Sequence, residues 1–233
     1  MTHENTQLES IRNAYKNCFD CPLSGCRKSI VFGTGNPRAG ILLVTDTPTE
    51  SQDRVGNYNT IDIGWTLGAF KCVLSNAGHT VPDRKEDLSK LFFSEVFITS
   101  AVMCRPIHLK GGKIGDYREP TWAKEVKKCR TRLLSTVYAV DPHIIVCAGK
   151  FATQALLGRS SALPARRGAL SALFEVVVPG KSADVRYSAI PAPDPTVCQR
   201  LGDYDDPNGM VSAYTNALSG AWTINQYLRN EDK

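Results

Sequence analysis

The fold is decided by residues 32–54, which read Phe32-Gly-Thr-Gly-Asn-Pro-Arg-Ala-Gly-Ile-Leu-Leu-Val-Thr-Asp-Thr-Pro-Thr-Glu-Ser-Gln-Asp-Arg54. A glycine-rich turn precedes the short apolar run at residues 41–44, which predicts a buried central strand. The run ends at Asp46, and Pro48 stiffens the chain beyond it. Since α/β folds locate their chemistry where the chain leaves the carboxyl end of a parallel strand, Asp46 is the first candidate for a functional side chain. A solvated turn without a function is the alternative.

The whole chain has the composition of an ordinary globular protein. Its 233 residues contain no internal repeat and no linker, so we expect a single domain over residues 1–233. No run of 18 or more apolar residues occurs and the N-terminus lacks the pattern of a signal peptide, so we expect no membrane contact and a cytoplasmic monomer. The 28 Lys and Arg residues against 23 Asp and Glu permit nucleic acid as a partner without requiring it.

Strand and helix patterns alternate along the rest of the chain. Besides residues 41–44, apolar runs predict strands at residues 95–102, 143–148, 173–178 and 186–190. Helical periodicity predicts helices at residues 4–16, 65–77, 86–92, 120–138, 150–157 and 210–229. Glycines and prolines predict loops at residues 108–117 and 191–208. The alternation predicts an α/β fold with a parallel or mixed sheet that helices cover on both faces.

Four of the eight cysteines predict a metal site. Cys18 and Cys21 form a Cys-x2-Cys pair, a standard half-site for zinc or for an iron–sulfur cluster. Cys104 follows the second predicted strand, and Cys129 lies in the helix after it. Four thiolates suit zinc or a [4Fe–4S] cluster, and spacing alone does not separate the two. Cys26 is a rival for one ligand place, and scattered free thiols are the alternative to a metal site.

Several motifs together resemble the [4Fe–4S]-containing uracil-DNA glycosylases of the family 4 type. They cover the chain from about Cys18 to the last helix and are specific only in combination. The matching pieces are Cys18-x2-Cys21-Pro22-Leu23, Val31-Phe-Gly-Thr-Gly-Asn-Pro37, Asp46-Thr-Pro with Gln52-Asp53-Arg54, Ile98-Thr-Ser-Ala-Val-Met-Cys-Arg-Pro106, Pro120-Thr121 with Cys129-Arg130, Ile144-Ile-Val-Cys-Ala-Gly149 with Ala155-Leu-Leu-Gly158, and Arg167-Gly168.

The resemblance implies a fold, a cofactor and a partner. The fold is a three-layer α/β/α arrangement around a central, mostly parallel sheet of four to five strands. The cofactor is a [4Fe–4S] cluster at an N-terminal knuckle of about residues 16–30, held by Cys18, Cys21, Cys104 and Cys129. The partner is DNA.

Departures from the family pattern bear on the substrate. The first motif reads Thr45-Asp46-Thr47-Pro48-Thr49, so a carboxylate remains where the family has glutamate, one methylene shorter. Ser100 stands where the family has an asparagine that pairs with uracil; a hydroxyl cannot make both of its contacts, and it leaves space. The family's late His-Pro-Ser becomes Asp194-Pro195-Thr196, and no histidine follows His143. An aromatic residue that stacks on the base is expected near Tyr58.

The resemblance and the residue types together suggest roles for individual side chains. A carboxylate would stabilise the positive charge that develops on the sugar or position the attacking water, and the candidates in order are Asp46, Asp53 and Asp194. The base-binding candidates are Thr45, Thr47, Tyr58, Ser100 and Thr196. The DNA-binding candidates are Arg54, Lys110, Lys113, Arg166, Arg167 and Arg200. A late-loop residue would fill the gap left by the extruded base, the candidates being Val197, Arg200 and Leu201. The alternatives are a loop cap for Asp46 and solvated charges for the basic residues.

These observations lead to one main hypothesis and three alternatives. The main hypothesis is a DNA glycosylase for a modified, non-uracil base, such as a bulky pyrimidine of the kind typical of phage DNA, with a role in antiphage defence. The first alternative is a non-catalytic protein of the same fold that binds modified DNA. The second is a phage enzyme that acts on hypermodified thymine without cleaving the bond, and the third is a conventional uracil repair enzyme.

Overall fold

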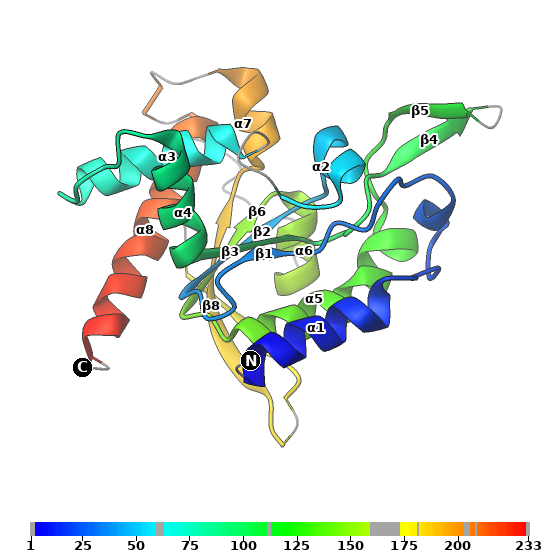
Figure 1. Cartoon of the computed structure of the whole chain (residues 1–233), viewed down its shortest axis with the longest axis horizontal. Helices are drawn as coiled ribbons and strands as arrows, with labels where there is room; N and C mark the ends of the chain where they lie inside the picture. The colour runs from blue at the N-terminus through cyan, green and yellow to red at the C-terminus, as the bar shows by residue number, and fades with distance from the viewer. Residues whose placement is uncertain are drawn as a thin grey trace.

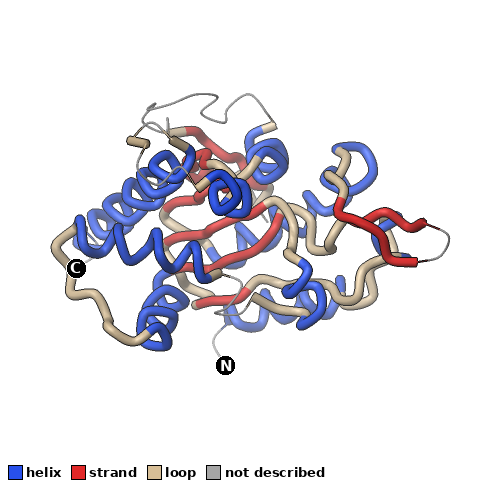
Figure 2. Tube along the Cα trace, turned by 90° about the horizontal axis from the view of Figure 1, so that it is seen from above, coloured by secondary structure: helices blue, strands red, loops and turns tan. Residues whose placement is uncertain are grey.

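The structure is a computed structural model that describes residues 3–58, 63–110, 113–158, 173–180, 182–202, 206–207 and 209–231 (Figure 1). Within these ranges, helices flank one central sheet, and a small two-stranded hairpin projects from the body of the molecule (Figures 1 and 2). No helix in these ranges combines the length and the apolar character that a membrane span needs.

The central sheet has six strands in the described part of the chain, and the inner four are parallel. In spatial order the strands are β1 (Thr34–Gly35), β3 (Val96–Ser100), β2 (Ile41–Thr45), β6 (Ile144–Ala148), β8 (Val185–Ala192) and β7 (Phe174–Val178). The edge strands β1 and β7 pair antiparallel. Every residue of β2 is buried, as expected for a strand with helices on both faces. Thr45 stands opposite Ser100 on one side and Ala148 on the other, so three strands end at the same edge.

Two apolar cores form because successive residues of β2 point to opposite faces of the sheet. Leu42 and Val44 pack in one core, and Ile41 and Leu43 pack in the other. The helices around the first core are α1 (His3–Tyr15), α5 (Lys127–Val140) and α6 (Lys150–Leu157). The helices around the second core are α3 (Gly64–Asn76), α4 (Lys85–Glu95) and α8 (Met210–Glu231). Figure 1 shows the two helical layers on either side of the sheet, so the predicted α/β fold with a mostly parallel central sheet is confirmed.

The sequence predicts most elements to within a few residues. All five predicted strands are present, and α6 has the predicted bounds. The sixth strand, β1, is only two residues long and lies inside the glycine-rich turn, where no periodicity can develop. The predicted helix at residues 120–138 starts as a π-helical turn, Trp122–Val126, and continues as α5. A 3-10 turn, Pro22–Gly25, follows the first cysteine pair.

The predicted loop at residues 108–117 is wrong. It forms an antiparallel hairpin of β4 (Ile107–Lys110) and β5 (Lys113–Tyr117). The glycines and basic residues in this segment give no alternation of apolar and polar residues, so the sequence does not show that the two strands pair with each other. Figures 1 and 2 show the hairpin projecting beyond the helical layers.

Two short helices also lie where the sequence predicts loops. The first, α2 (Glu50–Val55), begins at Thr49, whose side chain and that of Gln52 form a capping box. The second, α7 (Pro195–Leu201), begins at Asp194, which caps it, and has a proline in its first turn. Both carry ordinary helix-start signals, but their lengths of six and seven residues give too few turns for a visible apolar period.

Asp53 on α2 ties the N-terminal knuckle to the rest of the fold. The side chain is 2% exposed. Its carboxylate accepts hydrogen bonds from the backbone N–H of Lys28 at 3.1 and 3.2 Å and from that of Ser29 at 3.2 Å. Two partly buried loop amides are therefore paired with one carboxylate.

Asp53→Asn should destabilise the protein without touching the chemistry. The amide keeps one acceptor oxygen but turns an N–H toward loop donors, so we expect a loss of about 1–3 kcal/mol in the free energy of unfolding. Denaturant unfolding measures this loss. Asp83→Asn, the same charge change at an exposed position, is the control and should stay within about 0.5 kcal/mol of the parent. Equal stability of the two variants would contradict the structural role of Asp53.

Candidate active site

Asp46 comes directly after β2 and lies against the first turn of α6. Its Oδ1 accepts hydrogen bonds from the backbone N–H groups of Phe151 and Ala152, each at 2.8 Å. These donors are available because the first turn of a helix leaves its N–H groups without partners inside the helix. The helix dipole also favours a negative charge at this end. The main chain, and not another side chain, therefore fixes the position of the Asp46 carboxylate.

Gly149 connects β6 to α6 and passes beside the Asp46 carboxylate. Its φ of +120° is a conformation that side-chain-bearing residues rarely adopt. A Cβ at this position would lie 2.3 Å from Asp46 Cγ. The N–H of Gly149 donates to the carbonyl oxygen of Ala192 at 2.8 Å, which joins the end of β8 to the same point. Position 149 therefore admits only glycine while Asp46 keeps its place.

The electrostatic surroundings bring the titration of Asp46 close to neutral pH. Its side chain is buried, and burial raises its pKa to about 8. The carboxylate of Asp194 acts in the same direction because like charges disfavour ionisation. The backbone N–H groups of α6 oppose this shift. A carboxyl group that titrates in this range suits acid–base chemistry at physiological pH.

A cleft of about 550 Å³ opens beside Asp46 at the carboxyl edge of the sheet. Its volume is in the range typical of small-molecule sites. Its acidic side chains are Asp46, Glu50, Glu119 and Asp194; its basic ones are Arg105, Lys150 and Arg200; and its apolar and aromatic ones include Pro48, Tyr117, Phe151, Val197 and Met210. The cleft can therefore contact both a flat apolar group and anionic groups at its rim.

A smaller cavity of about 40 Å³ lies next to the cleft. Thr47, Asp194 and Thr196 border both spaces, and Thr45 and Tyr58 line the small one. Since a buried water needs roughly 10–15 Å³ on such a scale, this cavity has room for about three waters and not for a base.

Ser100 lies behind the small cavity, and its neighbours fill the space beside it. Its Oγ forms a short hydrogen bond with Tyr58 Oη and lies 3.1 Å from Thr45 Oγ1. Tyr58 is only 4% exposed, and burial raises the pKa of its phenol, which keeps it neutral. The prediction that Ser100 leaves open space is therefore wrong, because the Tyr58 side chain occupies that space. The hydroxyl groups of Ser100, Tyr58 and Thr45 therefore stand together beside the small cavity.

Asp194 and Thr196 lie at the start of α7, on the wall between the two cavities. The Asp194 carboxylate accepts hydrogen bonds from the backbone N–H of Thr196, at 2.7 Å, and from the Thr196 hydroxyl. Asp194 is thus both the N-cap of α7 and a charged neighbour of Asp46. Val197 and Arg200 on the same helix line the cleft, and Leu201 is 56% exposed beyond them.

Two other predicted site residues, Asp53 and Arg54, are not among the residues that line the two cavities. Asp53 is bound to the knuckle amides, and Arg54 on the same helix is exposed and lines neither space. Lys110 and Lys113 stand opposite each other in the backbone register of the β4–β5 hairpin. Arg166 and Arg167 lie outside the described residues.

The sequence reasoning missed several residues that form the site. Arg105 and Lys150 reach the cleft, where they pair with Glu50 and Glu119, each at 3.2 Å. Tyr117 reaches it from the base of the hairpin. The signal for Lys150 was present in the strand–glycine–helix pattern of residues 144–157, but nothing local indicates that Arg105 and Tyr117 converge on the same cleft.

The four candidate metal ligands are neighbours. Electrostatic interactions link Cys104 with Cys129, Cys21 and Cys18, and Cys18 with Cys129. Cys104 and Cys129 are buried, whereas Cys18 and Cys21 are partly exposed. The rival Cys26 points its Sγ at the carbonyl oxygen of Leu23, 3.5 Å away.

The four thiols are the donor type that structural zinc sites and [4Fe–4S] clusters share. Across the ranges that the structure describes, no three His, Cys, Asp or Glu side chains are grouped closely enough to hold one metal ion. A [4Fe–4S] cluster is larger than a zinc ion and spreads its four thiolates further apart. Burial raises the pKa of Cys104 to about 12, and metal binding favours the thiolate form. A [4Fe–4S] cluster on these four cysteines stays a prediction.

Comparisons with known proteins agree with this architecture. Residues 32–204 match the family model described as the uracil DNA glycosylase superfamily. A type-4 uracil-DNA glycosylase of Archaeoglobus fulgidus is 30% identical over 147 residues, which are 63% of this chain and 62% of that protein. Type-4 uracil-DNA glycosylases of Pyrobaculum aerophilum and Thermotoga maritima are 29% and 28% identical over 64% and 61% of this chain, and over 64% and 62% of their own lengths. The chain therefore spans about three fifths of the length of these relatives.

The four-cysteine arrangement makes a prediction about metal content. Protein purified without oxygen should contain about four iron atoms per chain and absorb broadly near roughly 400 nm, as a [4Fe–4S] cluster requires. Cys104→Ser should lose the iron, whereas Cys26→Ser, the matched control, should keep it. Iron analysis and the absorption spectrum measure both. Zinc without iron in the parent protein, or iron loss from the Cys26 variant alone, would contradict the ligand assignment.

Proposed function

The chain belongs to the uracil DNA glycosylase superfamily, and from that membership we propose that it is a DNA glycosylase that hydrolyses the N-glycosidic bond of a modified base. The observation that carries the proposal is the Asp46 carboxylate, held by the α6 amides in the wall of an open cleft. The same edge of the sheet is where α/β folds bind their ligands.

Asp46 is the proposed catalytic carboxylate. Glycosidic cleavage develops positive charge on the sugar, and an ionised carboxylate fixed before the reaction stabilises that charge or orients the attacking water. The two 2.8 Å bonds from the main chain go to Oδ1, so Oδ2 is the atom we assign to water or sugar. Asp194 is assigned a supporting role because its charge raises the pKa of Asp46. Asp53 is assigned no catalytic role, since its carboxylate is bound to loop amides.

The base-binding region supports a substrate other than plain uracil. Ser100, Thr45 and Tyr58 provide three hydroxyls there, and each hydroxyl donates only one hydrogen bond. Two amide side chains, Gln52 and Gln199, line the small cavity, and the amide oxygen of Gln52 already accepts a hydrogen bond from the backbone N–H of Thr49 at 3.0 Å. The adjoining cleft is more than ten times larger than the small cavity, which favours a base with a bulky substituent. Thr47 and Thr196 border both spaces and are assigned to base contact.

Basic and apolar side chains at the rim of the cleft are assigned to DNA. Arg105, Lys150 and Arg200 face the region where phosphates would lie, and two of them are already paired with carboxylates that phosphates would replace. Leu201 is the proposed wedge that fills the gap left by an extruded base, because it is the exposed apolar residue at the end of α7. Lys110 and Lys113 on the hairpin, with Arg54, Arg166 and Arg167, complete the proposed DNA-binding set.

The proposal also includes a cofactor, a cellular compartment and a biological role. Cys18, Cys21, Cys104 and Cys129 would hold a [4Fe–4S] cluster, whose part is to pin the N-terminal knuckle to α5. We propose a monomer that acts in the cytoplasm, where thiols stay reduced. Bulky pyrimidines are typical of phage DNA, so a modified-base substrate would make antiphage defence the biological role.

A second candidate function is excision of uracil itself. It is favoured by the relatives, which are named type-4 uracil-DNA glycosylases. The two further alternatives, a non-catalytic reader of modified DNA and an enzyme that alters hypermodified thymine, both require that no base is released.

An assay of base release from a panel of DNAs decides among these functions. The protein is incubated with uracil-containing duplex, unmodified duplex, and phage DNAs that carry hydroxymethylated or glycosylated pyrimidines, and released bases are identified by mass spectrometry. We expect release of a modified base and little release of uracil, since a site that lacks the pairing groups for a base can disfavour it by on the order of 10⁴. Uracil turnover comparable to that of ordinary repair enzymes would establish the second candidate instead.

Asp46→Asn should abolish base release and leave DNA binding nearly intact. The carboxylate acts on charge that exists only in the transition state, so turnover should fall by roughly 10²-fold or more while affinity is kept. Asn still accepts the α6 hydrogen bonds, so the fold should hold. Asp53→Asn is the control and should turn over at the parent rate. Parent-like turnover by the Asp46 variant would assign the chemistry elsewhere.

The raised pKa of Asp46 gives the reaction a pH dependence. Because the ionised carboxylate is the active form, kcat/KM should rise about tenfold per pH unit toward pH 8 and level off above it. Asp194→Asn removes a negative charge next to Asp46, so the midpoint of the kcat/KM profile should move to lower pH. Asn also caps helices well, so α7 should remain folded in this variant. A pH profile for each protein measures this. A flat profile, or a midpoint that moves upward in the variant, would contradict the assignment.

A further inference from the structure

Arg132 on α5 is a buried charge without a charged partner among the described residues. It is the largest of the fully buried side chains and is 1% exposed. Its guanidinium donates to Thr99 Oγ1 at 3.1 Å and to the carbonyl oxygens of Ser100, at 2.5 Å, and Ala101, at 3.3 Å. All three acceptors are neutral, and the Nε atom has no hydrogen-bond partner in the described part of the chain.

An unpaired charge in this position is costly. Burying an arginine away from water costs several kcal/mol unless an opposite charge or strong hydrogen bonds compensate. Carbonyl dipoles compensate in part, but no carboxylate forms an ion pair with Arg132 within the described ranges. A guanidinium does not lose its proton in proteins, so the charge remains and a nearby anion would stabilise it.

Two of the four candidate metal ligands, Cys129 on α5 and Cys104, are electrostatic neighbours of Arg132. Arg132 follows Cys129 by three residues, so the two side chains share one face of α5. The charge of Arg132 interacts with Cys129 and Cys104, and on its other side with Tyr58. Four thiolates around Zn²⁺ carry a net charge of about −2, and a [4Fe–4S] cluster on four thiolates is likewise an anion.

We propose that Arg132 is the internal counter-charge of the metal centre held by Cys18, Cys21, Cys104 and Cys129. The inference rests on the proposed four-cysteine centre. It explains why a charged side chain occupies the core, and it joins the centre to the base-binding region, because the same guanidinium holds the carbonyl groups of Ser100 and Ala101. Arg132 is therefore a positioning residue for both.

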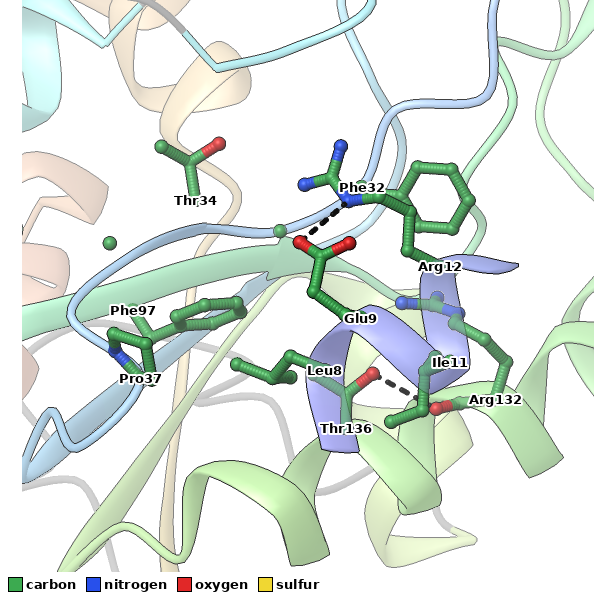
Figure 3. Close-up of a pocket in the computed structure, with 12 residues that line it drawn as sticks. Leu8, Glu9, Ile11, Arg12, Phe32, Thr34, Pro37, Phe97, Arg132 and Thr136 are labelled. Atoms are coloured by element: carbon green, nitrogen blue, oxygen red, sulfur yellow. Dashed lines mark hydrogen bonds and ion pairs between the residues drawn. The ribbon is translucent and has the colours of Figure 1, made fainter. Parts of the chain in front are cut away.

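A rival source of the anion lies beneath α1. Arg132 borders a cavity of about 230 Å³ that also contains Arg12 and Glu9. Figure 3 shows Arg132 behind α1, on the side of this cavity away from Phe97 and Pro37. Glu9 pairs with Arg12 at 3.8 Å and so does not serve Arg132 alone. A small anion such as phosphate in this cavity would be the alternative partner, and the experiment includes it.

The test measures how fast the metal leaves the loaded protein. Arg132→Met removes the charge and keeps most of the volume; Arg132→Lys keeps the charge and loses the forked geometry. Arg130→Met is the matched control, since Arg130 lies on the same helix, is half-buried and donates to the carbonyl oxygen of Ala155 at 2.8 Å. Each protein is purified anaerobically with its metal and mixed with excess chelator.

Arg132→Met should release metal at least about tenfold faster than the parent, while Arg132→Lys and Arg130→Met should release it at nearly the parent rate. A second readout is the melting temperature, measured for the metal-loaded and the metal-free protein. Arg132→Met should lower the melting temperature of the loaded form. It should not lower that of the metal-free form, because there the unpaired Arg132 charge itself destabilises the fold. If Arg132→Met does not fold, Arg132→Lys decides, because fast metal loss from it would assign the role to the hydrogen bonds and not to the charge.

Other results would overturn the inference. Equal lowering of both melting temperatures by Arg132→Met would make the role purely structural. A rise in the melting temperature of the parent with added inorganic phosphate, absent in Arg132→Met, together with unchanged metal release, would assign the counter-charge to the cavity beneath α1. A parent protein that contains no metal would refute the four-cysteine centre itself. A parent that contains metal, with Arg132 variants that release it at the parent rate, would refute only the role of Arg132.

Discussion

The pairing of the Asp46 carboxylate with the first amides of α6 is the interaction on which the site depends. It satisfies helix-terminal donors that have no other partner, and it holds a buried carboxylate at the point where β2 and β6 end together. It also requires glycine at position 149, whose N–H bonds to the end of β8. Three strands and one helix are therefore arranged around one carboxyl group, and the cleft opens beside it.

A second polar layer runs through the core from α5 to Thr45. Arg132 on α5 bonds to Thr99 and to the carbonyl group of Ser100, and the Ser100 hydroxyl contacts Tyr58 and Thr45. Each polar group in this layer is buried, so each relies on its neighbour to offset the cost of leaving water. The layer gives the proposed metal centre and the proposed base-binding residues a shared structural basis, although they are built from different parts of the chain.

The two cavities suggest how the superfamily architecture is adapted in this chain. The small cavity beside Tyr58 has no room for a base, while the open cleft has ample room and a mixed polar and apolar lining. Under the proposed function, a base with a large substituent would gain contacts in the cleft that a plain base cannot make.

Local patterns in the sequence were sufficient for five strands of the central sheet, for the principal helices and for the position of Asp46 at the exit of β2, because burial and turn propensities depend on neighbouring residues. They missed β1 and the β4–β5 hairpin. They were insufficient where a partner is distant. Asp46 and Phe151 are 105 positions apart, Tyr58 and Ser100 are 42 apart, and Asp53 bonds to amides about two dozen residues away. Which of these groups meet depends on strand register and on how the helices pack, so only the tertiary structure could separate the carboxylate in the cleft from the carboxylate that anchors the knuckle, and could fill the space beside Ser100.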